Sequence, residues 1–299
     1  MRTDSTTISK REAAQADQYF TRPKIAYACI HRLGDALGEE WMADSWWVEP
    51  SAGNGSFLRQ LPRWRAWGGD IHPQHPDVQL HDYLNDPLPP IPEGANGLAV
   101  GNPPFGKKSK LAIAFINRAL EHTGIVGFIV PIHLRKWSAQ RQIRKDARLI
   151  ADLNLPEDAF LFLGEPYSLR CCFQIWTTLP EEQVPGENLR IAAAPPTSHP
   201  DFSAWQYNRT PDALKYFDVD WDIAVLRQGY GDFGRIYRKD EKHLLDRKKQ
   251  WIFIKAHSPE ALERLLSLDF TELSRKNTGT PGFGKADLVD AYANKDESA

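Results

Sequence analysis

Residues 97–106 read Gly97-Leu98-Ala99-Val100-Gly101-Asn102-Pro103-Pro104-Phe105-Gly106. The apolar run that opens this stretch is short and bounded by glycines, which is typical of a buried strand. Two consecutive prolines can neither continue a strand ladder nor enter a helix interior, so they hold a stiff turn. We therefore expect a strand that ends near Gly101 and presents the side chain of Asn102 at its carboxyl end.

The residues after this strand suit recognition of an amino group. The side-chain carbonyl of Asn102 is an acceptor, and Pro103 offers a backbone carbonyl without a competing N–H. Two converging acceptors match an exocyclic amino group, which has two hydrogens to donate. Phe105 adds a flat face on which a planar base or amide can stack. The alternative interpretation is a Pro-Pro turn that only closes a strand.

A second motif lies upstream, where residues 46–57 read Trp46-Trp47-Val48-Glu49-Pro50-Ser51-Ala52-Gly53-Asn54-Gly55-Ser56-Phe57. The pattern predicts a strand, a glycine turn and the start of a helix. Gly53 and Gly55 let the backbone pass closely under a ligand, as in nucleotide-binding strand–turn–helix units. The spacing is not the six-residue dinucleotide fingerprint, and no lysine follows as in a phosphate-cradling loop.

With an acidic residue at the strand end, this glycine pattern resembles the first motif of S-adenosylmethionine-dependent methyltransferases. Together with Asn102-Pro103-Pro104-Phe105, the chain resembles amino-methyltransferases that modify exocyclic nitrogens, chiefly the gamma-order DNA adenine-N6 enzymes of bacteria and phages. The resemblance implies that Asn102, Pro103, Pro104 and Phe105 are catalytic. It also implies a Rossmann-like sheet of seven strands, mostly parallel with one reversed, and S-adenosyl-L-methionine as cofactor.

The resemblance extends to further cofactor contacts. Residues 17–23, Asp17-Gln18-Tyr19-Phe20-Thr21-Arg22-Pro23, are similar to the family segment that contacts the methionine end of the cofactor, although Arg22 intrudes before the proline. Asp82 matches the residue that bonds the cofactor adenine. Asp70 lies where an acidic residue meets ribose hydroxyls, although it could also be an ordinary turn residue. The implied cofactor contacts are Tyr19, Phe20, Thr21, Glu49, Ser51, Ala52, Gly53, Gly55, Asp70, Ile71, Asp82, Tyr83 and Asn102.

The length of 299 residues fits one large domain with a smaller appendage. Alternating strand and helix patterns predict an α/β fold with a parallel-centred sheet. We expect an N-terminal, cofactor-contacting helical segment at 1–45, frayed up to about residue 16, and a catalytic domain at 46–178. A proline-rich linker at 179–212 and a small α+β piece at 213–299 follow, and this piece is the candidate target-recognition region.

Local patterns predict several helices and loops. A helix over 24–40 would be capped by Thr21, and one over 111–121 by Ser109. The basic run over 133–148 is typical of a helix with one solvated face. A third cap, Ser258, precedes a helix that ends near Leu266, and residues 162–168 read as a loop near the target pocket.

The net charge of −2 gives no global attraction to nucleic acid, so binding would need local basic patches. Such basic segments also have interpretations without a nucleic-acid contact: charges that only aid solubility, a solvated helix face, or a surface turn. In the C-terminal piece, basic residues occur at 235–249, and Phe283 could touch substrate. The candidate phosphate contacts are Lys107, Lys108, Lys110, Arg135, Lys136 and Lys285.

Other classes of protein are less compatible with the sequence. No apolar run reaches membrane-spanning length, and the N-terminus lacks a signal-peptide core, so we expect a cytoplasmic protein. The three cysteines have no metal spacing, which indicates a reducing compartment. His72 and His75 are either surface residues or metal ligands, and the first interpretation is favoured, so no metal is expected.

The favoured function is methyl transfer to the N6 amino group of adenine in DNA, with base flipping. RNA adenine-N6 methylation remains the main alternative. Methylation of a protein glutamine, cytosine-N4 methylation and a non-catalytic binding module rank lower. The sequence leaves open the recognition site, the strand preference, the oligomeric state and any link to restriction.

Overall fold

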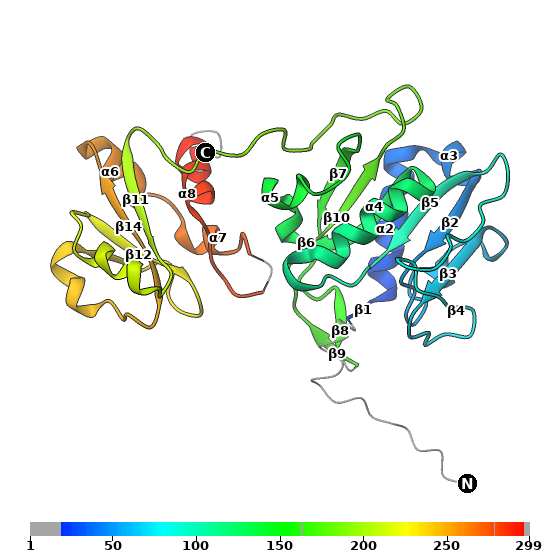
Figure 1. Cartoon of the computed structure of the whole chain (residues 1–299), viewed down its shortest axis with the longest axis horizontal. Helices are drawn as coiled ribbons and strands as arrows, with labels where there is room; N and C mark the ends of the chain where they lie inside the picture. The colour runs from blue at the N-terminus through cyan, green and yellow to red at the C-terminus, as the bar shows by residue number, and fades with distance from the viewer. Residues whose placement is uncertain (1–18, 163, 278, 296–299) are drawn as a thin grey trace, which may run out of the picture. The chain divides into compact units, whose positions relative to one another are not determined.

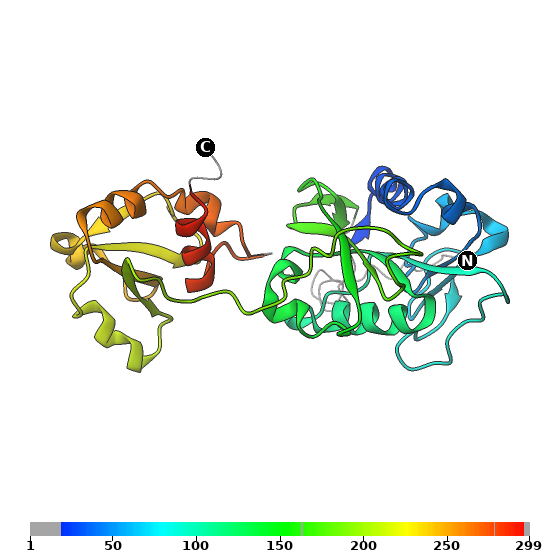
Figure 2. The same cartoon turned by 90° about the horizontal axis from the view of Figure 1, so that it is seen from above.

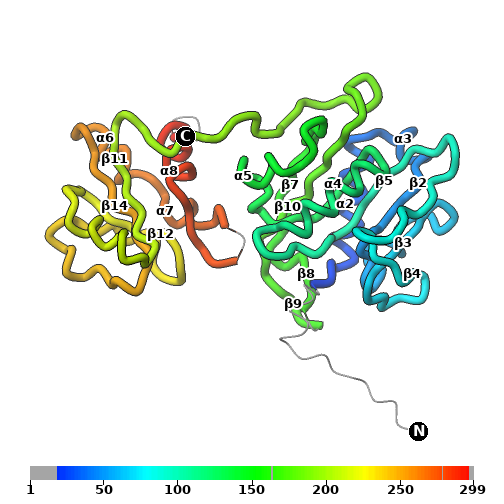
Figure 3. Tube along the Cα trace, in the orientation of Figure 1, coloured from blue at the N-terminus to red at the C-terminus, as the bar shows by residue number. Residues whose placement is uncertain are grey.

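A computed structural model describes residues 19–162, 164–277 and 279–295. The expectation that residues 1–16 are frayed, and Gln18 of the cofactor segment, lie outside these ranges. The chain divides into two compact units, Met1–Ala192 and Ala193–Ala299. Figures 1 and 3 show that the chain passes from the first unit to the second once.

A sheet of seven strands forms the centre of the first unit, in the order β4-β3-β2-β5-β6-β10-β7. Strands β2 to β6 run parallel, whereas β10 is antiparallel to both β6 and β7. The sheet is therefore mixed and mostly parallel, as expected. Its strands are β2 (Ser45–Glu49), β3 (Ala66–Asp70), β4 (Gln79–Leu80), β5 (Asn96–Gly101), β6 (Ile125–Pro131), β7 (Arg148–Asn154) and β10 (Cys171–Thr177).

Helices cover both faces of this sheet. Figure 2 shows α2 (Pro23–Leu37) on one face and α4 (Lys110–Thr123) on the other. Every residue of β6 and β10 is consequently buried, which explains their nearly continuous apolar sequences. Gly127 lets α2 approach β6, because an added Cβ would lie 2.8 Å from a methyl carbon of Leu33. The N-terminal segment thus packs into the same core as the expected catalytic domain.

Two expected helices do not form. After the glycine turn there are only the short 3-10 helices η1 (Leu58–Gln60) and η2 (Arg63–Arg65), because Pro62 lacks the N–H needed to continue. The basic run contains only η4 (Ile132–Arg135) and α5 (Trp137–Gln140). Beyond α5, the guanidinium of Arg190 donates to backbone carbonyls that helical N–H groups would otherwise use: those of Gln140, Ile143, Arg144 and Ala147.

Two expected helix caps are also wrong. The residue before α2 is Arg22, with Pro23 at the first helical position, and Thr21 belongs instead to strand β1 (Phe20–Thr21). Ser109 does precede α4, but it adopts φ 60° and its side chain makes no capping bond. A short helix, α3 (Glu39–Ala43), follows α2.

Strand β1 joins a small antiparallel sheet with β8 (Phe160–Phe162) and β9 (Glu165–Tyr167). The segment expected as a loop at 162–168 is therefore mostly a hairpin, although residue 163 is outside the described ranges. The ring of Tyr19 stacks on Tyr167 with centroids 5.0 Å apart. This contact ties the segment before α2 to the hairpin.

The second unit is a four-stranded antiparallel sheet in the order β11-β14-β12-β13. Ser258 caps α6, since its hydroxyl accepts from the N–H of Ala261 at 3.1 Å, as expected. Phe202–Tyr207 forms strand β11, so the expected linker at 179–212 extends too far. The elements are β11 (Phe202–Tyr207), η5 (Pro211–Phe217), β12 (Ile223–Gln228), β13 (Ile236–Arg238), η6 (Lys239–Leu244), β14 (Gln250–Ala256), α6 (Pro259–Leu266), α7 (Phe270–Ser274) and α8 (Lys285–Ala293).

Candidate active site

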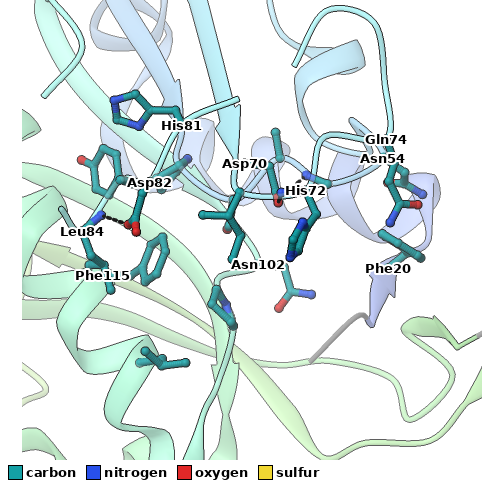
Figure 4. Close-up of a pocket in the computed structure, with 18 of the residues that line it drawn as sticks. Phe20, Asn54, Asp70, His72, Gln74, His81, Asp82, Leu84, Asn102 and Phe115 are labelled. Atoms are coloured by element: carbon teal, nitrogen blue, oxygen red, sulfur yellow. Dashed lines mark hydrogen bonds between the residues drawn. The ribbon is translucent and has the colours of Figure 1, made fainter. Parts of the chain in front are cut away.

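A cavity of about 310 Å³ opens where β2, β3 and β5 end (Figure 4). This is the carboxyl edge of the parallel strands, where open α/β sheets bind ligands. The volume is in the range of small-molecule sites, about 300–1,000 Å³. It is lined by Tyr19, Phe20, Thr21, Pro50, Ser51, Ala52, Gly53, Asn54, Ser56, Asp70, Ile71, His72, Gln74, His81, Asp82, Tyr83, Leu84, Asn85, Asn102, Pro104, Leu111 and Phe115.

The glycine turn after β2 forms one wall of this cavity. Gly53 and Gly55 have φ values of 46° and 76°, a conformation that favours glycine. An added Cβ on Gly53 would lie 3.3 Å from the ring of Phe20, so the small residue leaves room for that ring. The turn therefore depends on glycine for both its conformation and its packing.

Glu49 supports the turn from beneath. Its side chain is 2% exposed and accepts a hydrogen bond of 2.6 Å from the N–H of Leu58. Burial raises the pKa of its carboxyl well above the ordinary value, and the nearby charge of Asp70 acts in the same direction. Glu49 does not line the cavity.

Asp70 connects the end of β3 to the glycine turn. One carboxylate oxygen accepts from the N–H of Gly53 at 2.8 Å. The other accepts from the N–H of His72 at 2.7 Å, a bond drawn in Figure 4. A carboxylate has about four acceptor positions, so each oxygen can still bind a hydroxyl group. Asp70 can therefore hold the turn and contact a ligand at the same time.

Asp82 is fixed in a similar way. Its side chain accepts from the N–H of Leu84 at 3.1 Å and from the side-chain amide of Asn85 at 2.8 Å. The bond from Asn85 lowers the pKa of Asp82, so the carboxylate is a stable acceptor at neutral pH. Figure 4 shows its bond to Leu84 beside the cavity.

Tyr83 is 1% exposed and stacks on Phe115, with ring centroids 5.9 Å apart. Its hydroxyl lies 3.0 Å from Nδ1 of His122, and Nε2 of His122 lies 2.7 Å from the carbonyl of Pro89. Because a carbonyl only accepts, Nε2 carries the hydrogen and Nδ1 accepts from Tyr83. Burial lowers the pKa of His122, which favours this neutral ring.

Three buried oxygens of the lining residues have no hydrogen-bond partner within the described part of the chain. They are Oδ1 of Asn102, Oγ1 of Thr21 and Oγ of Ser51. The amide nitrogen of Asn102 donates to the carbonyl of Tyr19 at 3.0 Å, so its oxygen is the unused end. An unsatisfied buried polar group costs about 1–3 kcal/mol. Three such groups in one cavity indicate a polar ligand.

The motif residues around Asn102 are not all exposed to the cavity. Pro104 lines it, whereas Pro103 is buried and does not. Phe105 is 9% exposed and packs in the core, so its ring is not one of the cavity walls. The aromatic rings that line the cavity include those of Phe20 and Phe115 (Figure 4), together with Tyr19 and Tyr83.

Positive charge follows the motif directly. Lys107, Lys108 and Lys110 are exposed on η3 (Lys107–Ser109) and at the start of α4. Residues 101–150 contain ten Lys and Arg but only two Asp and Glu. Lys108 and Ser109 have φ values of 56° and 60°, which are uncommon for residues other than glycine. This turn therefore places charge beside the cavity at some conformational cost.

The other expected phosphate contacts differ from these lysines. The guanidinium of Arg135 bonds Asp152 at 2.7 Å and Asn154 at 2.8 Å, which gives it a structural role. Lys136 is partly exposed. Lys285 begins α8 in the second unit, and Phe283 is a core residue there rather than a surface contact.

Most of the expected cofactor residues line the cavity; Glu49 and Gly55 do not. The lining residues that the sequence analysis did not assign are Pro50, Asn54, Ser56, His72, Gln74, His81, Leu84, Asn85, Leu111 and Phe115. Several directly follow an assigned residue, so adjacency to a strand end was the available signal. In residues 19–162, 164–277 and 279–295, no group of three or more His, Cys, Asp and Glu side chains is placed to hold a metal ion.

The cysteines of the chain are free thiols inside the core of the first unit. Cys29, Cys171 and Cys172 are buried and unpaired. No helix in the described ranges is long and apolar enough to cross a membrane.

No protein-family model matches the chain, and no curated protein matches its sequence. Among solved structures, a type I restriction-modification system is 16% identical with a TM-score of 0.40, over 59% of this chain and 44% of that chain. The EcoKI M protein is 13% identical with a TM-score of 0.41, over 95% of this chain and 74% of that chain. The type IIL enzyme MmeI, in complex with DNA, is 13% identical with a TM-score of 0.34, over 91% of this chain and 51% of that chain. The chain thus spans less than half of the first protein. These similarities are too distant to assign an activity.

Proposed function

We propose that this protein transfers a methyl group from S-adenosyl-L-methionine to the N6 amino group of adenine in DNA. The observation that carries the proposal is the buried Oδ1 of Asn102, which lines the cavity and has no hydrogen-bond partner among the described residues. Asn102 opens the proline-rich turn whose sequence resembles that of amino-methyltransferases.

The residues of the cavity fit the cofactor. Asp70 and Asp82 have acceptor capacity for ribose hydroxyls and for the adenine amino group, respectively. Thr21 and Ser51 offer unpartnered hydroxyls, and Phe20 offers an apolar face. When bound, S-adenosyl-L-methionine would supply an electrophilic methyl group on a sulfonium: an amine nitrogen can attack the methyl carbon as the sulfur–methyl bond breaks, S-adenosyl-L-homocysteine leaves, and the methylated nitrogen loses one proton.

Asn102 and Pro103 would act on the N6 amino group of adenine. The nitrogen lone pair of this group is delocalised into the base, so the amino group is a poor nucleophile. Acceptance of one N–H by Asn102 Oδ1 favours a tetrahedral nitrogen with an available lone pair, and the motif implies the Pro103 carbonyl as the second acceptor, although Pro103 itself does not line the cavity. The bond to Tyr19 holds the amide of Asn102 in place before substrate arrives, so little reorganisation is needed.

A nucleic-acid substrate is supported by charge. Lys107, Lys108 and Lys110 are exposed beside the cavity and suit phosphate groups. A base within a duplex cannot reach such a cavity, so it would be flipped out. The DNA preference rests on the motif order and on the second unit that follows the catalytic motif. Phenylalanine after Pro104, where protein glutamine methyltransferases usually have tyrosine, disfavours that alternative.

The test is transfer of labelled methyl from S-adenosyl-L-methionine to duplex DNA, single-stranded DNA and total RNA in parallel. Nuclease digestion and chromatography then identify the modified base. N6-methyladenine in DNA, lost in Asn102→Ala, is the expected result. Label in RNA alone would replace DNA with RNA as substrate. No transfer to nucleic acid, despite measured cofactor binding, would refute the proposal.

A further inference from the structure

The second unit has one end where three loops meet. Antiparallel pairing places the end of β11, the start of β14, the end of β12 and the start of β13 together, through the pairs Tyr207–Trp251, Gln228–Gln250 and Val225–Ile236. Loops 208–210, 229–235 and 246–249 all leave the sheet here. The three strands β11, β14 and β12 can be followed in Figure 1.

These loops carry positive charge without matching ion pairs. Arg209, Arg247, Lys248 and Lys249 are exposed, and none forms an ion pair with a described residue. We call these four residues and Tyr230 the basic end. Two acidic residues lie in the same loops, and both serve the turns: Asp232 accepts from the N–H of Gly234, and Asp246 accepts from the N–H of Lys248.

The opposite end of the same sheet shows a different arrangement. There, Lys255 lies 3.0 Å from Asp220 and 2.9 Å from Asp222. Charge at that end is neutralised locally. At the basic end, the positive side chains repel one another, which lowers the stability of the fold. Their presence there therefore indicates a role other than stabilising the fold.

An exposed aromatic ring lies among these charges. Tyr230 is 81% exposed and stands between Gly229 and Gly231. A Cβ added at Gly231 would lie 3.6 Å from Nζ of Lys249, so the loop of Tyr230 lies against that lysine. A single exposed tyrosine is unremarkable, but one beside unpaired lysines combines the two chemistries that single-stranded nucleic-acid sites use.

Two side-chain hydrogen bonds fix the turn at residues 246–249, which carries Lys248 and Lys249. The hydroxyl of Tyr207 donates to the carbonyl of Arg247 at 2.8 Å, and the indole N–H of Trp251 donates to the carbonyl of Asp246 at 2.8 Å. The backbone that carries Lys248 and Lys249 is therefore fixed to β11 and β14. Preorganised charge loses less conformational entropy when it binds phosphate.

We propose that the basic end binds the phosphate backbone of nucleic acid, with Tyr230 stacked on an unpaired base. The lysines and arginines would contact successive phosphates, and the ring would use the face that every base offers. An acidic protein partner would use the charge but gives no role to the exposed ring. The inference rests on the proposed function only in that both assign nucleic acid as the partner.

The test is fluorescence anisotropy of the full chain, without cofactor, on labelled single-stranded DNA, duplex DNA and single-stranded RNA of equal length. Removing two phosphate contacts in Lys248→Ala/Lys249→Ala should weaken binding on the order of tenfold and lower the salt slope by roughly 1.5 to 2. Tyr230→Ala should weaken single-strand binding at least severalfold, by loss of stacking. The three nucleic acids distinguish DNA from RNA and paired from unpaired strands.

The matched control is Lys255→Ala, which removes one lysine at the opposite end of the sheet. It should leave affinity and salt slope unchanged, and thermal melting checks that all variants are folded. Wild-type affinity in the double-lysine variant would overturn the proposal, as would a wild-type protein that binds no nucleic acid. If the wild type methylates DNA but the double-lysine variant binds nucleic acid as tightly as the wild type, only this inference is refuted. If the double-lysine variant binds nucleic acid more weakly but the wild type transfers no methyl group, only the proposed function is refuted.

Discussion

The side-chain amide nitrogen of Asn102 donates a hydrogen bond of 3.0 Å to the backbone carbonyl of Tyr19, 83 residues earlier in the chain. This bond decides which end of the amide is free. Because the nitrogen is occupied, Oδ1 is the atom left for a ligand, and it has no partner among the described residues. The segment before α2 therefore orients the central residue of the site.

The first prediction concerns Asn102→Ala. Loss of one preorganised contact to the reacting group should lower the rate of methyl transfer about 10²–10³-fold. Cofactor affinity should change little, because the cavity has many other polar contacts. Single-turnover methyl transfer and calorimetric titration with S-adenosyl-L-methionine measure the two effects separately. A variant with near wild-type transfer would remove Asn102 from the mechanism.

Local pattern was enough to place Asn102 at a strand end, because the apolar run and the two prolines are adjacent to it. Its bond to Tyr19 could not be predicted, since no local pattern connects residues so far apart. The same limit explains the basic run at 133–148. There, the guanidinium of Arg190, far along the chain, bonds backbone carbonyls that a helix would use for its own hydrogen bonds. Phe105 looked like a stacking face, but its burial depends on the core around it.

The second prediction concerns Asp70→Ala. The change removes the acceptor for the N–H groups of Gly53 and His72, so the glycine turn loses its tie to β3. Hydrogen bonds to charged groups contribute about 1.5–3 kcal/mol each, less where water can replace them. Cofactor affinity should fall at least tenfold, and the free energy of unfolding should fall by about 1–2 kcal/mol. Calorimetry and urea denaturation measure these quantities.

The matched control for Asp70 is Asp77→Ala. Asp77 pairs with Arg63 at 2.7 Å on the surface, and Arg63 is largely exposed. Exposed pairs contribute at most about 1 kcal/mol. We expect this variant to bind cofactor like the wild type, and an equal loss in both variants would contradict a specific role for Asp70.

The third prediction concerns the pH dependence of Glu49. Burial raises the pKa of its carboxyl in the folded state, whereas the unfolded value is near 4.3. Between these two values the folded protein binds more protons than the unfolded chain, so its stability falls as pH rises. Glu49→Gln keeps an acceptor for the N–H of Leu58 but cannot ionise.

The stability of the wild type relative to Glu49→Gln should therefore decline from about pH 4.3 upward. Urea midpoints measured between pH 4 and 8 test this, with Glu39→Gln as the control because Glu39 is exposed on α3. A difference that stays constant across this range would show that Glu49 has an ordinary pKa in the folded state.

The fourth prediction concerns Tyr83→Phe, which removes the hydroxyl that donates to Nδ1 of His122 and keeps the ring on Phe115. The unpaired acceptor should lower the free energy of unfolding by about 1 kcal/mol, while cofactor affinity stays within about twofold. Tyr27→Phe is the control, since Tyr27 is 63% exposed and should change stability by less than about 0.5 kcal/mol. Urea denaturation near pH 8 keeps His122 neutral. If both variants unfold at the same urea concentration as the wild type, the bond between Tyr83 and His122 contributes nothing to stability. The cavity wall would then depend on ring packing alone.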